Sequence, residues 1–148
     1  MLFRSEENFM RVLKKSQIPS GDDVLFEMMR VKAGVPKVGV DVTEENLPQE
    51  GRLDAALHFQ KGCYLGQEII ARLHYRGHVN REIAHFVSSS QQLKVGDEIF
   101  FEDKKCGNIT SVAFDSRSGR SYALGYVLRD MKKNGNKFTV SQAELEIL

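Results

Sequence analysis

The sequence predicts an α+β fold, in which a helical part is followed by a small antiparallel β-barrel. Two observations lead to this prediction. Apolar residues recur at helical spacing before Gly77, and they alternate with a period of two after it. Turn residues then divide the second part into segments of strand length. Residues 1–78 and 79–148 are therefore expected to form two structural units.

The helical part is expected to contain three helices and a short helical turn. Residues 7–15 carry apolar residues on one face of a first helix. The second helix follows Ser20-Gly21-Asp22, which offers an N-cap, and ends at Gly34. Residues 53–57 suggest one or two helical turns, and the last helix begins at Gly66.

The second part is expected to contain six strands, at residues 81–87, 98–101, 107–114, 122–127, 138–140 and 143–147. The turns between them are expected at residues 95–97, 103–106, 116–120 and 134–136. Six short strands in about seventy residues are typical of a small antiparallel barrel or sandwich.

Composition excludes several classes of protein. The 148 residues carry a net charge of +1, which argues against a nucleic-acid partner for the molecule as a whole. No apolar run approaches the roughly 20 residues of a membrane helix. The N-terminus lacks the apolar region of a secretory signal. Two distant cysteines indicate a reducing compartment, so a cytoplasmic location is expected.

The most informative segment is residues 59–81, which place Cys63 in a turn that opens a helix. Lys61 lies two residues before it, and both a helix start and a nearby lysine lower the pKa of a thiol. Gly62 and Gly66 are expected to permit the turn and a close backbone approach. The sequence thus predicts a reactive or metal-binding thiolate; the alternative is a small buried apolar residue, as most free cysteines are.

Polar neighbours of Cys63 extend the candidate site. Gln67 and Glu68 fall in the first turn of the expected helix, where an acid suits the helix dipole. Glu68 is either that cap or an acceptor for a ligand. Arg72, Arg76 and Arg81 are expected to form a basic lip that would attract a carboxylate or phosphate; a solvated charged face is the alternative.

Other candidate ligands are weaker. Cys106 is expected in a hairpin turn, where it would be a second ligand only if the barrel folds against the Cys63 corner. His74 and His78 are four residues apart, but Gly77 interrupts the helix between them. The chain has no CxxC pair, so a dedicated zinc site is not expected. Walker, dinucleotide and GxSxG motifs do not occur.

Five segments give the chain a family resemblance. KGCYLGQE at residues 61–68 resembles the signature of the YgfZ-type folate-binding proteins, relatives of the aminomethyltransferase called the glycine-cleavage T-protein. MRVKAGVP at residues 29–36 and LPQE at 47–50 look like a helix end and a turn of this family. GNITS at residues 107–111 and YALGY at 122–126 look like strands of its C-terminal barrel.

The resemblance implies a role in maintaining or assembling iron–sulfur enzymes, linked to tetrahydrofolate. Cys63 would be the working thiol and a shared cluster ligand, because cluster irons are held by thiolates. Lys61 and Arg81 would hold the folate tail, and Tyr64, Gln67 and Glu68 would orient the ligand or partner. The implied partners are cluster carriers and client enzymes, in the mitochondrial matrix if the source is eukaryotic.

Two departures limit the resemblance. Lys32 stands where the T-proteins have an acid that contacts the folate ring, which argues against aminomethyl transfer, the alternative function. The family's N-terminal half is missing, so residues 1–78 resemble only the C-terminal part of the folate-binding domain. We expect weak or no folate binding unless another chain completes the pocket. A third reading is a barrel that only makes protein contacts, with Cys63 structural.

Overall fold

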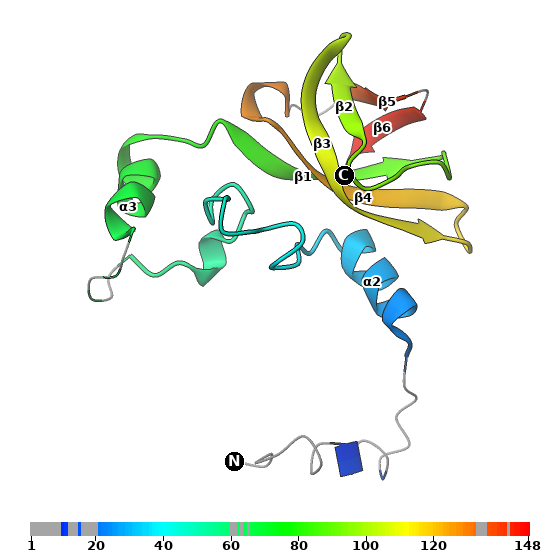
Figure 1. The fold of residues 1–148 in the computed structure, drawn as a ribbon, viewed down its shortest axis with the longest axis horizontal. Coiled ribbons are helices and arrows are strands. Elements are labelled where there is room, and N and C mark those ends of the chain that lie inside the picture. The colour runs from blue at the N-terminus through cyan, green and yellow to red at the C-terminus, as the bar shows by residue number, and fades with distance from the viewer. Residues whose placement is uncertain are drawn as a thin grey trace.

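The computed structural model describes residues 10–11, 15, 21–59, 62, 64, 66–132, 136–141 and 143–148. It contains helices beside a closed antiparallel barrel, which confirms the predicted α+β class. Figure 1 shows the barrel at one side, with α2 packed beneath it and α3 set apart. The first expected helix, residues 7–15, lies mostly outside the described residues.

Helix α2 (Asp23–Lys32) follows the predicted boundaries. The Asp22 side chain accepts a hydrogen bond of 2.7 Å from the Leu25 backbone N–H and so caps the helix. The chain leaves the helix through Gly34, whose φ of +71° is a conformation that glycine adopts without strain. Two local signals, one at each end, therefore define this element.

The segment after α2 is a series of turns that leads to a short 3₁₀ helix, η1 (Asp54–Ala56). Helix α3 (Gln67–Arg76) then runs from the N-cap Gly66 to Gly77, as predicted. The chain enters the barrel at Arg81.

The barrel closes in the order β1-β4-β3-β2-β5-β6, and β6 pairs with β1. All pairs are antiparallel, so the structure forms the barrel and not the sandwich. The six predicted strands are confirmed within a few residues: β1 (Arg81–Ser88), β2 (Glu98–Phe101), β3 (Lys104–Asp115), β4 (Arg120–Leu128), β5 (Lys137–Val140) and β6 (Ala143–Ile147). A second 3₁₀ turn, η2 (Arg129–Met131), follows β4.

One predicted turn is wrong. Cys106 lies in β3 because the hairpin closes at Glu102 and Asp103, both with positive φ. A two-residue turn of this geometry is normally formed by Gly or Asn. The Glu-Asp pair found here therefore does not indicate a turn from the sequence. Residues 104–106 therefore continue the strand.

The barrel interior is the main core, formed by large side chains that are fully buried: Phe86, Ile99, Ile109, Val127, Phe138, Val140 and Leu145. Burying each of them contributes about 1.5–3 kcal/mol. A second cluster on the outer face of the barrel packs Val31 of α2 against Ile83, Leu124 and Tyr126. This cluster fixes α2 on the barrel.

Candidate functional site

The KGCYLGQE corner is described only in part. Lys61 and Cys63 lie outside the described residues. Gly62 is exposed, and Tyr64 is half-buried. Gly66 has a φ of +83°, which confirms that the turn into α3 requires glycine or considerable strain. In the described part of the chain, no atom beyond the chain neighbours lies within 4 Å of a Cβ placed at Gly62 or Gly66.

The N-terminus of α3 is the end that Cys63 precedes in the sequence. Its N-cap, Gly66, supplies no side-chain hydrogen bond, and Glu68 in the first turn is exposed. Gln67 is half-buried. Because backbone N–H groups at a helix start carry partial positive charge, this end favours an anion such as a thiolate.

Aromatic contacts help to hold helix α3 in place. Among the described residues 67–76, none is buried. Phe59 stacks on His74 with ring centroids 3.8 Å apart, and Tyr75 packs edge-on against both rings. His74 therefore serves as a stacking partner for the loop before the corner.

The expected basic lip divides into two parts. Arg72 and Arg76 are exposed on α3. Arg81 begins β1, and its Nε donates to Oε1 of Glu50 at 3.2 Å. The Arg81 guanidinium also lies 5.3 Å from the centroid of the Tyr126 ring. Burial, followed by the charge of Glu50, raises the pKa of Tyr126 to about 12.

The LPQE turn connects α3 to the barrel. The Gln49 side-chain amide donates to the Ile70 carbonyl oxygen of α3 at 3.1 Å. The Glu50 carbonyl oxygen accepts from the Ile83 N–H of β1 at 2.7 Å. The turn thus contacts both α3 and the start of β1.

A buried ion pair, which the sequence analysis missed, joins α2 to the barrel. Arg30 donates to Asp41 at 2.8 Å and to the Ser111 hydroxyl at 2.9 Å. Asp41 is almost fully buried and also accepts from Thr110. The only available signal was the family likeness of the MRVKAGVP and GNITS segments, which contribute the arginine and the two hydroxyls.

Lys32, the last residue of α2, forms an ion pair with the barrel. Its Nζ lies 2.6 Å from Oδ2 of Asp115, and 5.4 Å from the centroid of the Tyr122 ring. The hydrogen bond from Lys32, together with one from the Arg117 backbone, lowers the pKa of Asp115 to about 2. Asp115 was not singled out from the sequence, because a single acid after a strand resembles any turn residue.

Cys106 is a core residue and not a second ligand. It is buried inside the barrel, and its thiol donates to the Ile99 carbonyl oxygen at 3.3 Å. Burial raises the pKa of this thiol, which opposes the thiolate form that binds metals. Within the described ranges, no three His, Cys, Asp or Glu side chains gather as a metal site would require.

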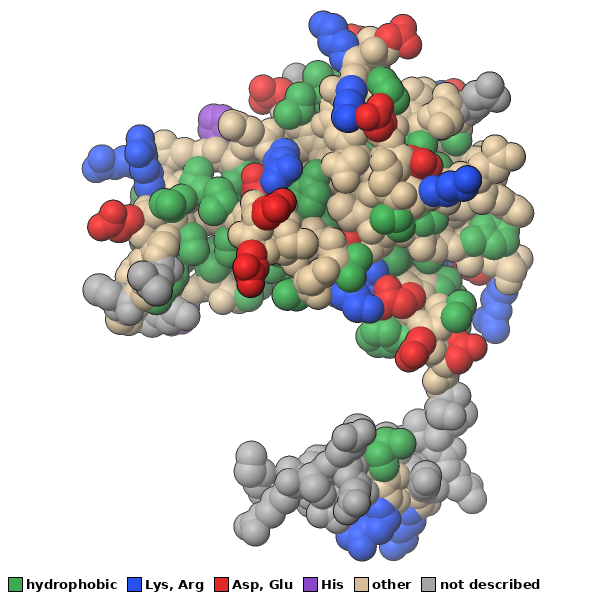
Figure 2. Space-filling model, viewed as in Figure 1, with side chains coloured by type: hydrophobic (Ala, Val, Ile, Leu, Met, Phe, Trp, Pro, Cys, Tyr) green, Lys and Arg blue, Asp and Glu red, His purple; other side chains and the backbone are tan. Residues whose placement is uncertain are grey.

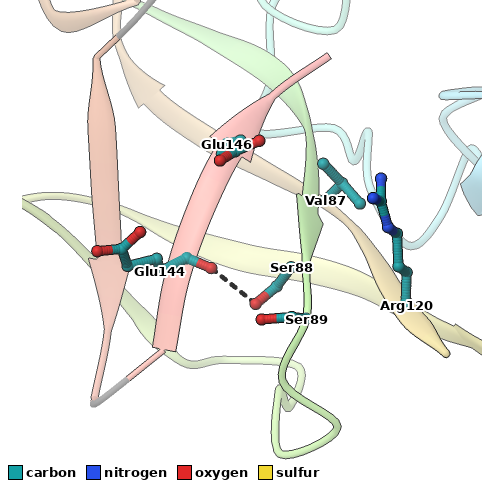
Figure 3. Close-up of a pocket in the computed structure, with 6 residues that line it drawn as sticks. All are labelled: Val87, Ser88, Ser89, Arg120, Glu144 and Glu146. Atoms are coloured by element: carbon teal, nitrogen blue, oxygen red, sulfur yellow. Dashed lines mark hydrogen bonds between the residues drawn. The ribbon is translucent and has the colours of Figure 1, made fainter.

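A small polar hollow on the outer barrel surface lies away from these residues (Figure 3). It is lined by β1, β6 and the start of β4, and its volume is about 160 Å³. The Ser88 hydroxyl donates to the Glu144 carbonyl oxygen at 2.7 Å and so joins two strands. None of the residues predicted from the sequence lines it, so it is not the candidate site.

Comparison with known proteins supplies the family. Residues 81–147 match the model of the glycine cleavage T-protein C-terminal barrel domain. The tRNA-modifying protein YgfZ of Aliivibrio fischeri is 28% identical over 120 residues, which are 76% of this chain and 37% of that protein. Together these matches support a YgfZ-type family for the chain, related to the T-protein aminomethyltransferase.

Two further relatives extend the comparison. An uncharacterised protein of Haemophilus influenzae is 35% identical over 111 residues, covering 68% of this chain and 40% of that protein. The mitochondrial iron-sulfur cluster assembly factor IBA57 homolog of Yarrowia lipolytica is 36% identical over 74 residues, covering 48% and 15%. The chain thus spans two fifths or less of the length of these relatives.

A solved structure shares the fold. The aminomethyltransferase T of the glycine cleavage system from Bartonella henselae matches with a TM-score of 0.80 and 19% identity. The match covers 97% of this chain and 42% of that chain. The helical part and the barrel therefore have the same arrangement as in that longer protein.

Proposed function

We propose that this chain is an accessory factor in the assembly or repair of iron–sulfur cluster enzymes, with the Cys63 thiolate as its working group. The observation that carries the proposal is the KGCYLGQE segment directly before α3, in a T-protein-like fold. One relative is named an iron-sulfur cluster assembly factor, and another a tRNA-modifying protein. The chemistry of the corner supports the same role.

A single thiolate cannot hold a cluster alone. Cys63 would supply one ligand to a cluster that bridges to cysteines of a carrier or client enzyme, since cluster irons are bound by thiolates. Lys61 and the N-terminus of α3 would favour the ionised sulfur. The cluster is then cargo that passes between proteins.

Tetrahydrofolate is the cofactor that the family resemblance implies. Lys61 and Arg81 would hold its carboxylate tail, and the Arg81 side chain is 45% exposed beside Glu50. Gly62, Tyr64, Gly66, Gln67, Glu68 and Arg76 would surround the ligand or the partner. Arg81 fits a carboxylate in charge and exposure, although Glu50 already engages part of its guanidinium.

The pocket for folate would be completed by further protein. Residues 1–78 would be the C-terminal part of the folate-binding domain, and residues 79–148 the barrel domain. We expect the 148-residue chain to bind tetrahydrofolate weakly or not at all, because the remaining pocket is supplied by the N-terminal half. A calorimetric titration tests this, and micromolar affinity of the chain alone would contradict it.

The proposed partners are cluster carriers and client enzymes, with no direct nucleic-acid contact. A tRNA-modifying role for a relative is compatible with this if the clients are tRNA-modifying enzymes that carry clusters. The proposed location is the cytoplasm, or the mitochondrial matrix in a eukaryote. No helix in the described part of the chain is long and apolar enough to cross a membrane.

Aminomethyl transfer is the second candidate, favoured by the shared fold. The Lys32–Asp115 pair argues against it, because the position that would contact the folate ring is basic and already occupied by a salt bridge. A turnover assay for tetrahydrofolate-dependent aminomethyl transfer decides between the two functions. Aminomethyl-transfer activity that is retained in a folded Cys63→Ala variant would favour the transferase.

The leading proposal is tested by mixing the chain anaerobically with a cluster-loaded carrier. We expect a visible-absorbing complex that is lost in Cys63→Ala and retained in Cys106→Ala. The second variant is the matched control, because Cys106 lies inside the barrel. Circular dichroism confirms that both variants are folded. Identical spectra for the wild type and Cys63→Ala would refute the thiolate mechanism.

A further inference from the structure

Arg81, at the start of β1, holds a carboxylate of its own chain in a loose ion pair. Its Nε donates to Oε1 of Glu50 at 3.2 Å, and its Nη2 donates to Oε2 at 3.4 Å. These distances are long for hydrogen bonds between two charged groups, which are usually about 2.7–2.9 Å. The buried Arg30–Asp41 pair, at 2.8 Å, has the tighter geometry in the same molecule.

The arginine of this pair faces solvent. The Arg81 side chain is 45% exposed, whereas that of Glu50 is 12% exposed. In Figure 2, basic and acidic side chains lie beside one another on the surface between α3 and the barrel. An anion from solution can therefore reach the guanidinium, whose Nε and Nη2 edge suits one carboxylate. Because Glu50 occupies that edge, a second carboxylate has to compete with it.

The Tyr126 hydroxyl offers Glu50 an alternative partner. Tyr126 is 5% exposed, and no described residue forms a hydrogen bond with its hydroxyl. Arg81 contacts both side chains, because its guanidinium also lies 5.3 Å from the centroid of the Tyr126 ring. Burial, followed by the charge of Glu50, raises the pKa of Tyr126 to about 12, so the hydroxyl is a donor at neutral pH. A buried donor without a partner is unfavourable, and a carboxylate is a strong acceptor for it.

The backbone of Glu50 is fixed, so only its side chain needs to move. The Glu50 carbonyl oxygen accepts from the Ile83 N–H at 2.7 Å, which ties this residue to β1. The Glu50 Oε2 also accepts from the Leu47 N–H of the same turn at 3.2 Å. A change of side-chain rotamer would release Arg81 and leave the turn in place.

We propose that Glu50 is an internal competitor that occupies Arg81 until a carboxylate ligand displaces it, and that the Tyr126 hydroxyl then donates to the displaced Glu50 carboxylate. The proposed exchange rests on the proposed function, in which Arg81 binds a carboxylate tail. It replaces one ion pair of Arg81 by another and supplies an acceptor to a buried hydroxyl, which offsets part of the cost of displacing Glu50.

The test titrates the 148-residue chain with glutarate, a dicarboxylate, and follows the NMR signal of the Arg81 Nε–H, which Arg81→Lys identifies by its loss. Glu50→Gln should bind glutarate about fivefold more tightly, the effect of removing one neighbouring charge in water. Glu82→Gln is the matched control, because Glu82 lies in the same strand but pairs with Arg129 and Lys132. It should leave the affinity unchanged.

Tyr126→Phe separates the exchange from simple removal of a charge. With Glu50 present it should weaken glutarate binding about threefold or more, because the displaced carboxylate loses its new donor. In the Glu50→Gln background it should have no effect. In the wild-type chain, isotopically labelled at tyrosine, the Tyr126 ring signal should shift together with the Arg81 signal.

Four results would overturn the inference: equal glutarate affinity of the wild type and Glu50→Gln, the same effect of Tyr126→Phe in both backgrounds, a Tyr126 signal that stays unchanged while Arg81 binds, or no response of Arg81 to glutarate in either protein. The tyrosine measurement needs no variant that could fail to fold. Glutarate involves neither a cluster nor a pteridine ring, so these outcomes are distinguishable from failure of the Cys63 chemistry.

Discussion

At the residue scale, Arg30 and Asp41 form a buried ion pair. Arg30 is 8% exposed and Asp41 is 1% exposed, so water solvates neither charge well. The structure compensates with hydrogen bonds from Arg30 to Val35 and Ser111, and from the Lys37 N–H to Asp41. Removing one partner would leave the other charge buried and incompletely paired.

Asp41→Ala is expected to lower the free energy of unfolding by about 3–5 kcal/mol, the usual effect of breaking a buried pair. Glu27→Ala is the control, because Glu27 pairs with the same arginine from a partly exposed position. Its loss should cost much less than the loss of Asp41, because water screens an exposed ion pair. Urea denaturation of both variants at neutral pH measures the difference. Equal losses in the free energy of unfolding would contradict the stabilising role of the buried Arg30–Asp41 pair.

His85 makes stability depend on pH. Burial lowers the pKa of His85, and a hydrogen bond with the Val31 backbone only partly opposes this. The unfolded chain therefore takes up a proton near pH 6.5 while the folded chain resists it, so stability should fall as the pH drops below about 6.5. In His85→Phe this loss should be reduced; in His78→Phe, at an exposed site, it should persist. Thermal melts between pH 7 and pH 5 make the comparison.

At the element scale, the close packing of β3 against β4 accounts for the glycines in the GNITS and YALGY segments. A Cβ at Gly107 would lie 1.7 Å from the Tyr126 carbonyl oxygen, and one at Gly125 would lie 2.6 Å from that of Asn108. The register also shifts between Ile109 and Ser111. The intervening Thr110 donates to Asp41. The bulge thus connects the strand to the helical part.

Gly107→Ala is expected to destabilise the barrel by at least about 1–3 kcal/mol, because the added methyl group would overlap backbone atoms of β4. Gly62→Ala should change stability much less, since no atom of the described residues outside its chain neighbours lies within 4 Å of the added carbon. Thermal denaturation compares the two substitutions. If the Gly107→Ala variant is as stable as Gly62→Ala, β3 and β4 can move apart enough to accommodate the methyl group, and the prediction is wrong.

At the scale of the whole molecule, the barrel and the helices differ in how they are held. The barrel has its own core, α2 is tied to it by a buried network, and α3 depends on Gln49 and a ring stack. Local stability should therefore decrease from the barrel to α2 and then to α3. This order leaves the candidate site on the least stable element.

Hydrogen exchange should show this order directly, with the slowest amides in the barrel and the fastest helical amides in α3. Gln49→Leu should accelerate exchange in residues 67–76 and leave the barrel unaffected, because it removes the bond to the Ile70 carbonyl oxygen. Mass spectrometry of exchanged peptides measures both. Uniform exchange across the chain would mean that α3 and the barrel open together.

Much of the fold was predictable from local patterns. The period of two located all six strands, Asp22 and Gly34 bounded α2, and Gly66 and Gly77 bounded α3. Cys106 was misplaced because a hairpin turn formed by Glu102 and Asp103 has no local signature. In the candidate site, Gly66 at the start of α3 was predictable, whereas the pairing of Arg81 with Glu50 was not.

The order of residues along the chain was enough to indicate the element types, the family and the cysteine on which the proposed chemistry depends, because each is encoded within a few neighbouring positions. The closed barrel, the burial of Cys106 and the Arg30–Asp41 and Lys32–Asp115 pairs emerged only from the folded molecule. They join residues far apart in the chain, and which distant charges meet depends on register, bulges and packing that no local pattern specifies.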